Sequence, residues 1–248
     1  MKKFTLLSLI FISIIFSSCT FTEDIYINDD GTGKFTMDMD GSSLMAMIPK
    51  DSGKVQKNID STFTFKELFE LKKDSIAKLP QEEQDRLKKL ENFKMKIKMN
   101  FDEKQFLFNM NTDFKNVNEL QDMMSTMNGV QSINPTSKNK EAALATEGFG
   151  SNNSTLKYYY DGKKFTRNAV MNKNLKTNAK SDSLKSSYEM IYKSSNYILR
   201  YHFPKKVKKI SNEKASFSED RKTITIEYPF DEYMNNPEKL NFEIDFEK

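Results

Sequence analysis

Cysteine, histidine and tryptophan are scarce in this chain, which has one, one and none of them among its 248 residues. The single cysteine, Cys19, excludes an internal disulfide, so an apolar core must stabilise the fold. The single histidine, His202, and the lack of phosphate-loop, zinc-protease and serine-hydrolase motifs leave no recognisable catalytic group. We therefore predict no enzyme activity, no metal site and no cofactor.

Arginine is also scarce, and it occurs only as Arg86, Arg167, Arg200 and Arg221. Nucleic-acid recognition favours arginine forks and clustered basic stripes, whereas lysines and acids are interspersed here. The formal net charge of +4 falls closer to zero if a segment holding Lys2 and Lys3 is removed. Nucleic acid is therefore not an expected partner.

The first twenty residues are typical of a secretory signal. Two lysines precede an apolar run over 4–16, which is too short to cross a bilayer comfortably, and small residues then lead to Cys19. The stretch IIFSSCT resembles the lipobox of bacterial lipoproteins, although Phe16 stands where that family usually has leucine. The resemblance implies cleavage between Ser18 and Cys19 and a palmitate-type acyl anchor on Cys19.

These residues predict a signal peptide over 1–18, a lipidated tether over 19–24 and one domain over 25–248. We expect the first strand near Ile25, which would hold the domain within about 20 Å of a membrane. The expected location is the cell envelope, at the outer membrane, on either its periplasmic or its surface face. An envelope protein is a candidate partner, and the oligomeric state is not specified.

Strand–turn–strand patterns followed by helical patterns recur along the predicted domain. Asp-Gly pairs at 30–31 and 161–162, and weaker acidic pairs at 102–103 and 219–220, separate runs of alternating apolar and polar residues. In one such run, 93–101, apolar side chains alternate with lysines. Alternation with one polar face predicts an antiparallel sheet that is buried on one side.

Amphipathic helices are expected to cover the buried side of this sheet. Candidate helices lie at 66–90 with a break at Pro80, after Asn116, and at 184–192. The predicted fold class is α+β: an antiparallel sheet built from β-hairpin–helix units, with helices packed on one face. A polar segment at about 128–153 interrupts the pattern and is expected to be a long loop.

Three local features bear on function. His202 alternates with buried-type aromatic residues and is expected on the solvent face beside Arg200. The turn NDDGTG at 28–33 lacks the later ligands of a calcium loop and is better explained as a hairpin turn. In the run 158–160, Tyr159 must point opposite to both neighbouring tyrosines, which makes it a candidate partner contact.

Two longer stretches also resemble lipoproteins. The stretch EDIYINDDGTGKFTMDMDGSSLM at 23–45 resembles the first hairpin of Bacteroidetes-type lipoproteins of unassigned function. The C-terminal stretch over 197–247 is loosely similar to mycobacterial LppM-type lipoproteins, in a strand that ends at proline and in a later hairpin. Neither resemblance contains a functional motif, so neither transfers an active site.

The function expected from the sequence is that of a membrane-anchored, non-enzymatic interaction or structural module. The chain has 14 methionines and 20 phenylalanines, which would give a soft and adaptable core. This composition supports an alternative, in which the domain carries or senses an apolar or lipid ligand between its sheet and its helices. A hydrolase that uses carboxylates is a weaker third reading, since no acidic pair is brought together by the sequence.

Overall fold

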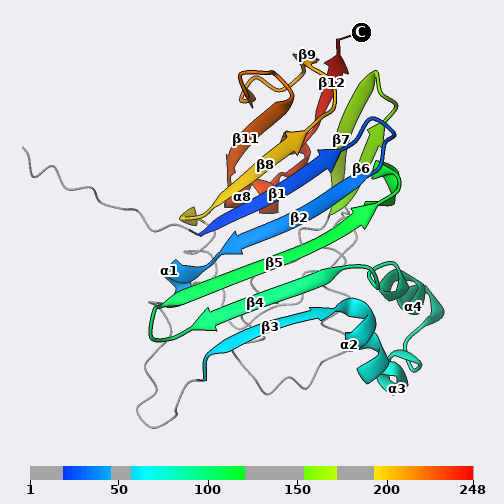
Figure 1. Cartoon of the computed structure of the whole chain (residues 1–248), viewed down its shortest axis with the longest axis vertical. Helices are drawn as coiled ribbons and strands as arrows, with labels where there is room; N and C mark the ends of the chain where they lie inside the picture. The colour runs from blue at the N-terminus through cyan, green and yellow to red at the C-terminus, as the bar shows by residue number, and fades with distance from the viewer. Residues whose placement is uncertain (1–18, 46–56, 121–153, 172–192, 248) are drawn as a thin grey trace, which may run out of the picture.

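The structure is a computed structural model, which describes residues 19–45, 57–120, 154–171 and 193–247 (Figure 1). Three predicted features lie outside the described residues: the signal peptide at 1–18, the polar segment at about 128–153 and the helical stripe at 184–192. No helix within the described ranges is long and apolar enough to cross a membrane.

The chain is a mixed α+β protein in which strands predominate, and the described strands form two sheets. The larger sheet has the strand order β10-β11-β8-β1-β2-β5-β4-β3, and the smaller has the order β6-β7-β12-β9. The larger sheet comprises β1 (Thr20–Ile27), β2 (Gly33–Asp40), β3 (Ile59–Thr64), β4 (Lys94–Asn100), β5 (Gln105–Phe114), β8 (Asn196–His202), β10 (Ser216–Phe217) and β11 (Thr223–Pro229). The smaller sheet comprises β6 (Ser154–Tyr160), β7 (Lys164–Met171), β9 (Val207–Ile210) and β12 (Phe242–Phe246).

Strand β1 lies in the middle of the larger sheet and differs from the prediction in two ways. It begins at Thr20 rather than near Ile25. The prediction placed the start too late because Glu23 takes an inward position between Phe21 and Ile25, so apolar residues do not alternate regularly there. Strand β1 pairs with β2 in antiparallel fashion but with β8 in parallel. The expectation of a purely antiparallel sheet is therefore wrong at this pair, which joins segments far apart in the chain.

The predicted hairpins β1–β2, β4–β5, β6–β7 and β10–β11 are all present. In the Asp-Gly turns only the glycines have positive φ, +81° at Gly31 and +79° at Gly162. The aspartates cap the turns instead: Asp30 accepts a bond from the Thr32 amide, and Asp161 accepts bonds from the amides of Lys163 and Lys164. Hydrogen bonds lower the pKa of both carboxyl groups, for Asp30 chiefly the bond from the Thr32 hydroxyl and then that from its amide, and for Asp161 chiefly the two amide bonds.

The helices are short: α1 (Ser42–Met45), α2 (Phe65–Leu71), α3 (Lys73–Ile76), α4 (Gln81–Lys88) and α8 (Phe230–Asn235), with 3-10 turns η1 (Val117–Glu119) and η2 (Pro237–Leu240). The predicted break at Pro80 is confirmed, since α4 begins directly after it. Helix α2 is fixed by a reciprocal capping box between Thr64 and Glu67. Asn116 is a cap, as predicted, since it accepts a bond from the Asn118 amide. The helix expected after it is only the 3-10 turn η1 in the described part of the chain, because Leu120 is extended, and residues from 121 on lie outside that part.

The smaller sheet covers the inner face of β1 and β8 around Tyr201, and helix α8 packs only against Phe21 and Tyr197 at one end of these strands. Phe165 from β7 packs edge-on against Tyr201 from β8 with ring centres 5.5 Å apart, and Tyr201 also contacts Phe242 from β12 at 5.6 Å. The expectation that helices cover the whole sheet is therefore wrong over this part. Segments 154–171 and 242–246 have period-two burial, so they pack as strands.

Candidate functional site

A buried charge pair lies in the interface between the two sheets. Glu23 projects from the inner face of β1 and is 1% exposed, and Arg167 projects from β7 and is 2% exposed. Arg167 Nη2 lies 3.7 Å from Glu23 Oε2. A single unpaired charge at this depth would be unfavourable by several kcal/mol, so each group depends on the other.

Three tyrosine hydroxyls complete the surroundings of the Glu23 carboxylate. Tyr158 and Tyr201 donate hydrogen bonds to its Oε1 atom, and Tyr197 donates to Oε2 at 2.6 Å. Arg167 donates through Nε to the Tyr201 hydroxyl at 3.1 Å and through Nη1 to the last carbonyl oxygen of η2 at 3.1 Å. The three hydroxyl groups thus donate to both oxygens of the Glu23 side chain, which accept hydrogen bonds. We call these five residues, Glu23, Arg167, Tyr158, Tyr197 and Tyr201, the Glu23 cluster.

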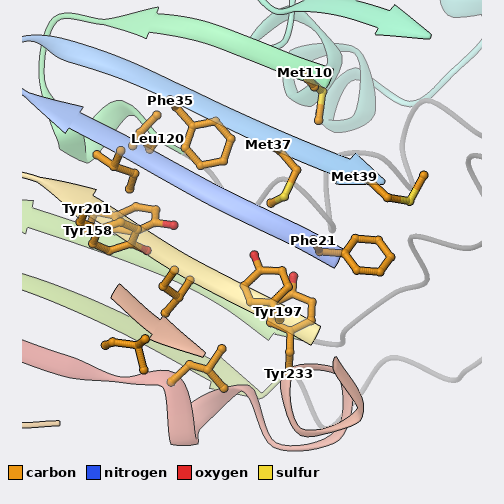
Figure 2. Close-up of a cluster of buried hydrophobic side chains, with 14 of the residues drawn as sticks. Phe21, Phe35, Met37, Met39, Met110, Leu120, Tyr158, Tyr197, Tyr201 and Tyr233 are labelled. Carbon is orange, nitrogen blue, oxygen red and sulfur yellow. The ribbon is translucent and has the colours of Figure 1, made fainter. Parts of the chain in front are cut away.

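The tyrosines of the Glu23 cluster are held in their protonated form. Burial, followed by the neighbouring charge of Glu23, raises the pKa of Tyr158, Tyr197 and Tyr201 well above its usual value. Tyr197 is further fixed by a parallel stack on Tyr233 of α8, with ring centres 3.9 Å apart (Figure 2). A cluster that is closed to solvent and internally bonded joins the two sheets and presents no group to a substrate.

The outer face of β1 and β8 carries a second polar group. Asp24 points away from the Glu23 cluster and is 6% exposed. His202 Nε2 lies 3.4 Å from Asp24 Oδ1, and Arg200 Nη1 lies 3.8 Å from Asp24 Oδ2. The Thr223 hydroxyl lies 3.0 Å from His202 Nδ1. His202 and Arg200 are therefore on the outer face, as the sequence predicted, where both meet a carboxylate that the sequence did not assign to them.

The predicted site residues lie apart from one another. Cys19 directly precedes β1 and is 2% exposed, with its Sγ 2.9 Å from the Ser43 hydroxyl. Its carbonyl oxygen accepts a hydrogen bond from the Asn196 amide at 3.0 Å. Ser18 lies outside the described residues. Tyr159 is on the smaller sheet, is 45% exposed and points opposite to Tyr158, as predicted.

Sequence reasoning missed the Glu23 cluster, although two signals for it are present. Glu23 has the same parity as Phe21 and Ile25, and Arg167 has the same parity as Phe165 and Ala169. Two residues of opposite charge at apolar positions of different strands are a sign of a buried pair, because neither is stable there alone. The excess of tyrosine near these strands was a second sign, since buried tyrosines need hydroxyl partners.

Among the described residues, no group of three or more histidine, cysteine, aspartate or glutamate side chains is arranged to hold a metal ion. The acidic turn at 28–33 is the hairpin turn between β1 and β2, in agreement with the sequence-based interpretation.

No protein-family model and no curated protein matches this sequence. Among solved structures, the chain is similar to the folded domain of the LppM protein of Mycobacterium tuberculosis, with a TM-score of 0.34 and 8% sequence identity. The match covers 92% of this chain and 89% of that chain. A score this low does not establish a common fold, so no residue role is taken from it.

Proposed function

We propose that this protein is a cell-envelope lipoprotein, anchored through a lipid on Cys19, that acts as a non-enzymatic interaction or structural module. The observation that carries the proposal is the position of β1, whose first residue follows Cys19 directly. Every residue of β1 therefore belongs to the chain that remains after the predicted cleavage. Two or more acyl chains on Cys19 would give stable anchoring, whereas a single chain is marginal.

The contacts of Cys19 define what lipidation would change. An acylglyceryl group replaces the thiol proton, so Sγ could accept a hydrogen bond from Ser43 but no longer donate one. The backbone bond from Asn196 to the Cys19 carbonyl oxygen does not involve the thiol and is compatible with the modified residue. The anchor would then join the fold at its central strand without a linker.

The non-enzymatic part of the proposal is supported by the Glu23 cluster. Its carboxylate, its guanidinium and its three hydroxyls are buried and bonded to one another. Catalytic groups must reach a substrate, whereas these groups hold two sheets together. A structural role accounts for their placement.

Metabolic labelling with a clickable fatty acid tests the anchor in cells. The natural chain should take up the label and lose its signal segment, and Cys19→Ser should abolish both. Ser43→Ala is the matched control, because it removes the side chain that contacts Cys19 Sγ but leaves the modified residue in place. Label that persists in Cys19→Ser would disprove the proposed anchor.

The methionine-rich face of the larger sheet favours a second candidate function, the binding of an apolar or lipid ligand. Met37, Met110 and Met95 lie directly opposite one another across β2, β5 and β4, and all three are buried. Methionine adapts to irregular apolar shapes and is common at permissive binding surfaces. Native mass spectrometry of the chain from Thr20 onward separates the two candidates: a carrier should retain a lipid of defined mass, and an interaction module should give only the mass of the chain.

A further inference from the structure

A shallow hollow opens at the end of β1 that lies farthest from Cys19. Its volume is about 320 Å³, which falls at the low end of the range of about 300–1,000 Å³ for small-molecule sites. Its lining combines the aromatic residues Tyr26 and Phe114 with the polar residues Asn28, Thr32, Lys34 and Asp113. The hollow belongs neither to the Glu23 cluster nor to the predicted anchor.

Tyr26 forms a supported aromatic wall of this hollow. Tyr26 is 45% exposed as a residue, and its ring stacks on His202 with ring centres 3.9 Å apart and planes 2° from parallel. His202 is itself held through both ring nitrogens, by the Thr223 hydroxyl at 3.0 Å and by Asp24 at 3.4 Å. The His202 ring therefore has a fixed orientation, and the stack on it fixes the orientation of the exposed Tyr26 ring.

The polar rim of the hollow is also fixed in place. Asn28 Nδ2 donates to the Thr32 hydroxyl at 2.9 Å, and that hydroxyl donates to Asp30 Oδ1 at 2.7 Å. Lys34 and Asp113 lie directly opposite each other on β2 and β5, so the rim carries one positive and one negative charge.

Gly33 allows the Tyr26 backbone and the Phe114 ring to approach β2 closely. A Cβ atom at this position would lie 1.9 Å from the Tyr26 carbonyl oxygen and 2.4 Å from the Phe114 ring. Any other residue here would push β1 and β5 away from β2. The shape of the hollow thus depends on glycine at this position.

We propose that this hollow binds a neutral saccharide ring. A sugar ring has an apolar C–H face, which stacks on an aromatic side chain such as Tyr26, and hydroxyl groups at its edge, which both donate and accept hydrogen bonds. The rim offers an amide, a hydroxyl, an ammonium and a carboxylate at that edge. The opposite charges of Lys34 and Asp113 favour neither an anion nor a cation, and the small volume suits one ring of a longer glycan.

A saccharide would be a partner of stated chemistry for this domain, and its binding would not depend on a lipid at Cys19. Six strand residues lie between Cys19 and Tyr26 of the hollow, which corresponds to about 23 Å along β1. A bound glycan would lie at the end of the domain away from the anchor.

Titration calorimetry with chitohexaose and maltohexaose tests the site on the full chain, purified in a detergent whose headgroup is not a sugar. At least one of the two oligosaccharides should bind, and Tyr26→Ala should weaken that binding about tenfold or more, as truncation of an anchoring aromatic does. Tyr26→Phe should bind nearly as the natural chain does, because the ring that stacks is retained.

Tyr159→Ala is the matched control, since Tyr159 is also 45% exposed but lies on the smaller sheet. It should leave the affinity unchanged. If Tyr26→Ala does not fold, as judged by thermal melting, Asp113→Ala takes its place and should weaken binding several-fold. The saccharide site is refuted if neither oligosaccharide binds, or if the Tyr26 or Asp113 variant behaves like the Tyr159 control. Fatty-acid labelling is independent of either result.

Discussion

Over β1 and β8 the inner face of the larger sheet carries two tyrosines and the buried Glu23, whereas over β2, β5 and β4 it carries methionines and phenylalanines. Figure 2 labels Tyr197 and Tyr201 of the first region and Met37 and Met110 of the second. We call the first region, the inner faces of β1 and β8, the tyrosine half, and the second, the inner faces of β2, β5 and β4, the methionine half. The two share one continuous sheet, since β1 and β2 pair along eight residues. Glu23 of the tyrosine half is directly opposite Met37 of the methionine half.

The difference between the halves shows two ways of filling a core. In the tyrosine half, directional hydrogen bonds from Tyr158 and Arg167 fix how the smaller sheet sits on the larger one. In the methionine half, flexible side chains fill volume and require no particular partner geometry. Substitutions in the first half should therefore be judged by charge and hydrogen bonding, and those in the second by volume.

The largest effect is expected from Arg167→Met, which removes the partner that β7 contributes to Glu23 of the tyrosine half. This change keeps an unbranched apolar stem but leaves the Glu23 carboxylate without its positive partner, which should lower the free energy of unfolding by about 3–5 kcal/mol. Chemical denaturation measures the loss. The double variant Glu23→Gln with Arg167→Met should recover a large part of it, because no buried charge remains. A single Arg167→Met variant as stable as the natural chain would show that the ion pair does not hold the sheets together.

The methionine half should tolerate change of shape better than loss of volume. Met110→Ala removes most of a buried side chain and should cost about 2–5 kcal/mol, whereas Met110→Leu keeps the volume and should cost less than about 1.5 kcal/mol. Denaturant midpoints of the two variants test this contrast. Similar, large losses for both would mean that this half is packed as specifically as the tyrosine half.

A smaller effect is expected from Tyr201→Phe at neutral pH. It removes the hydroxyl between Arg167 and Glu23 and should cost about 1–3 kcal/mol, because two buried groups each lose a partner. Tyr159→Phe, at an exposed position, should change stability by less than about 0.5 kcal/mol in the same denaturation assay.

Tyr201→Phe should also alter the pH dependence of stability. The pKa of the buried tyrosines is raised in the folded protein, so above about pH 10 the unfolded chain releases protons that the folded chain keeps. Their contribution is complete below that pH and is lost as the pH rises, by about 1.4 kcal/mol per pH unit for each tyrosine. Tyr201→Phe removes one of these groups, so its stability should fall less steeply with pH. An unchanged slope would contradict the closed state of the cluster.

The sequence predicts local structure well where apolar and polar residues alternate without interruption. In β4 and β5 the inward set, including Met95, Phe106 and Phe108, is buried as expected. The prediction misses the start of β1 because Glu23 breaks the pattern. It also misses the second sheet. The alternation of apolar and polar residues shows which side chains of 154–171 are buried, but not against which part of the protein they pack.

The candidate site was less predictable than the fold, for a physical reason. The Glu23 cluster joins β1, β6, β7 and β8, and no local spacing links Glu23 with Arg167. The same holds for the stack of Tyr26 on His202, which depends on the parallel pairing of β1 with β8. Tyr159, in contrast, could be placed on its face because only its two neighbours were needed.

The position of β1 determines how the domain would respond to mechanical load. A pull applied at Cys19 acts along the axis of a strand that is paired over eight residues with β2 and over seven with β8. Both ladders are then loaded in shear, so their hydrogen bonds resist together instead of opening one after another from an end. Forced unfolding is governed by the rate of crossing the unfolding barrier, and shear raises that barrier relative to peeling. A domain held at this point would stay folded under tension that would peel a terminal strand from the edge of a sheet.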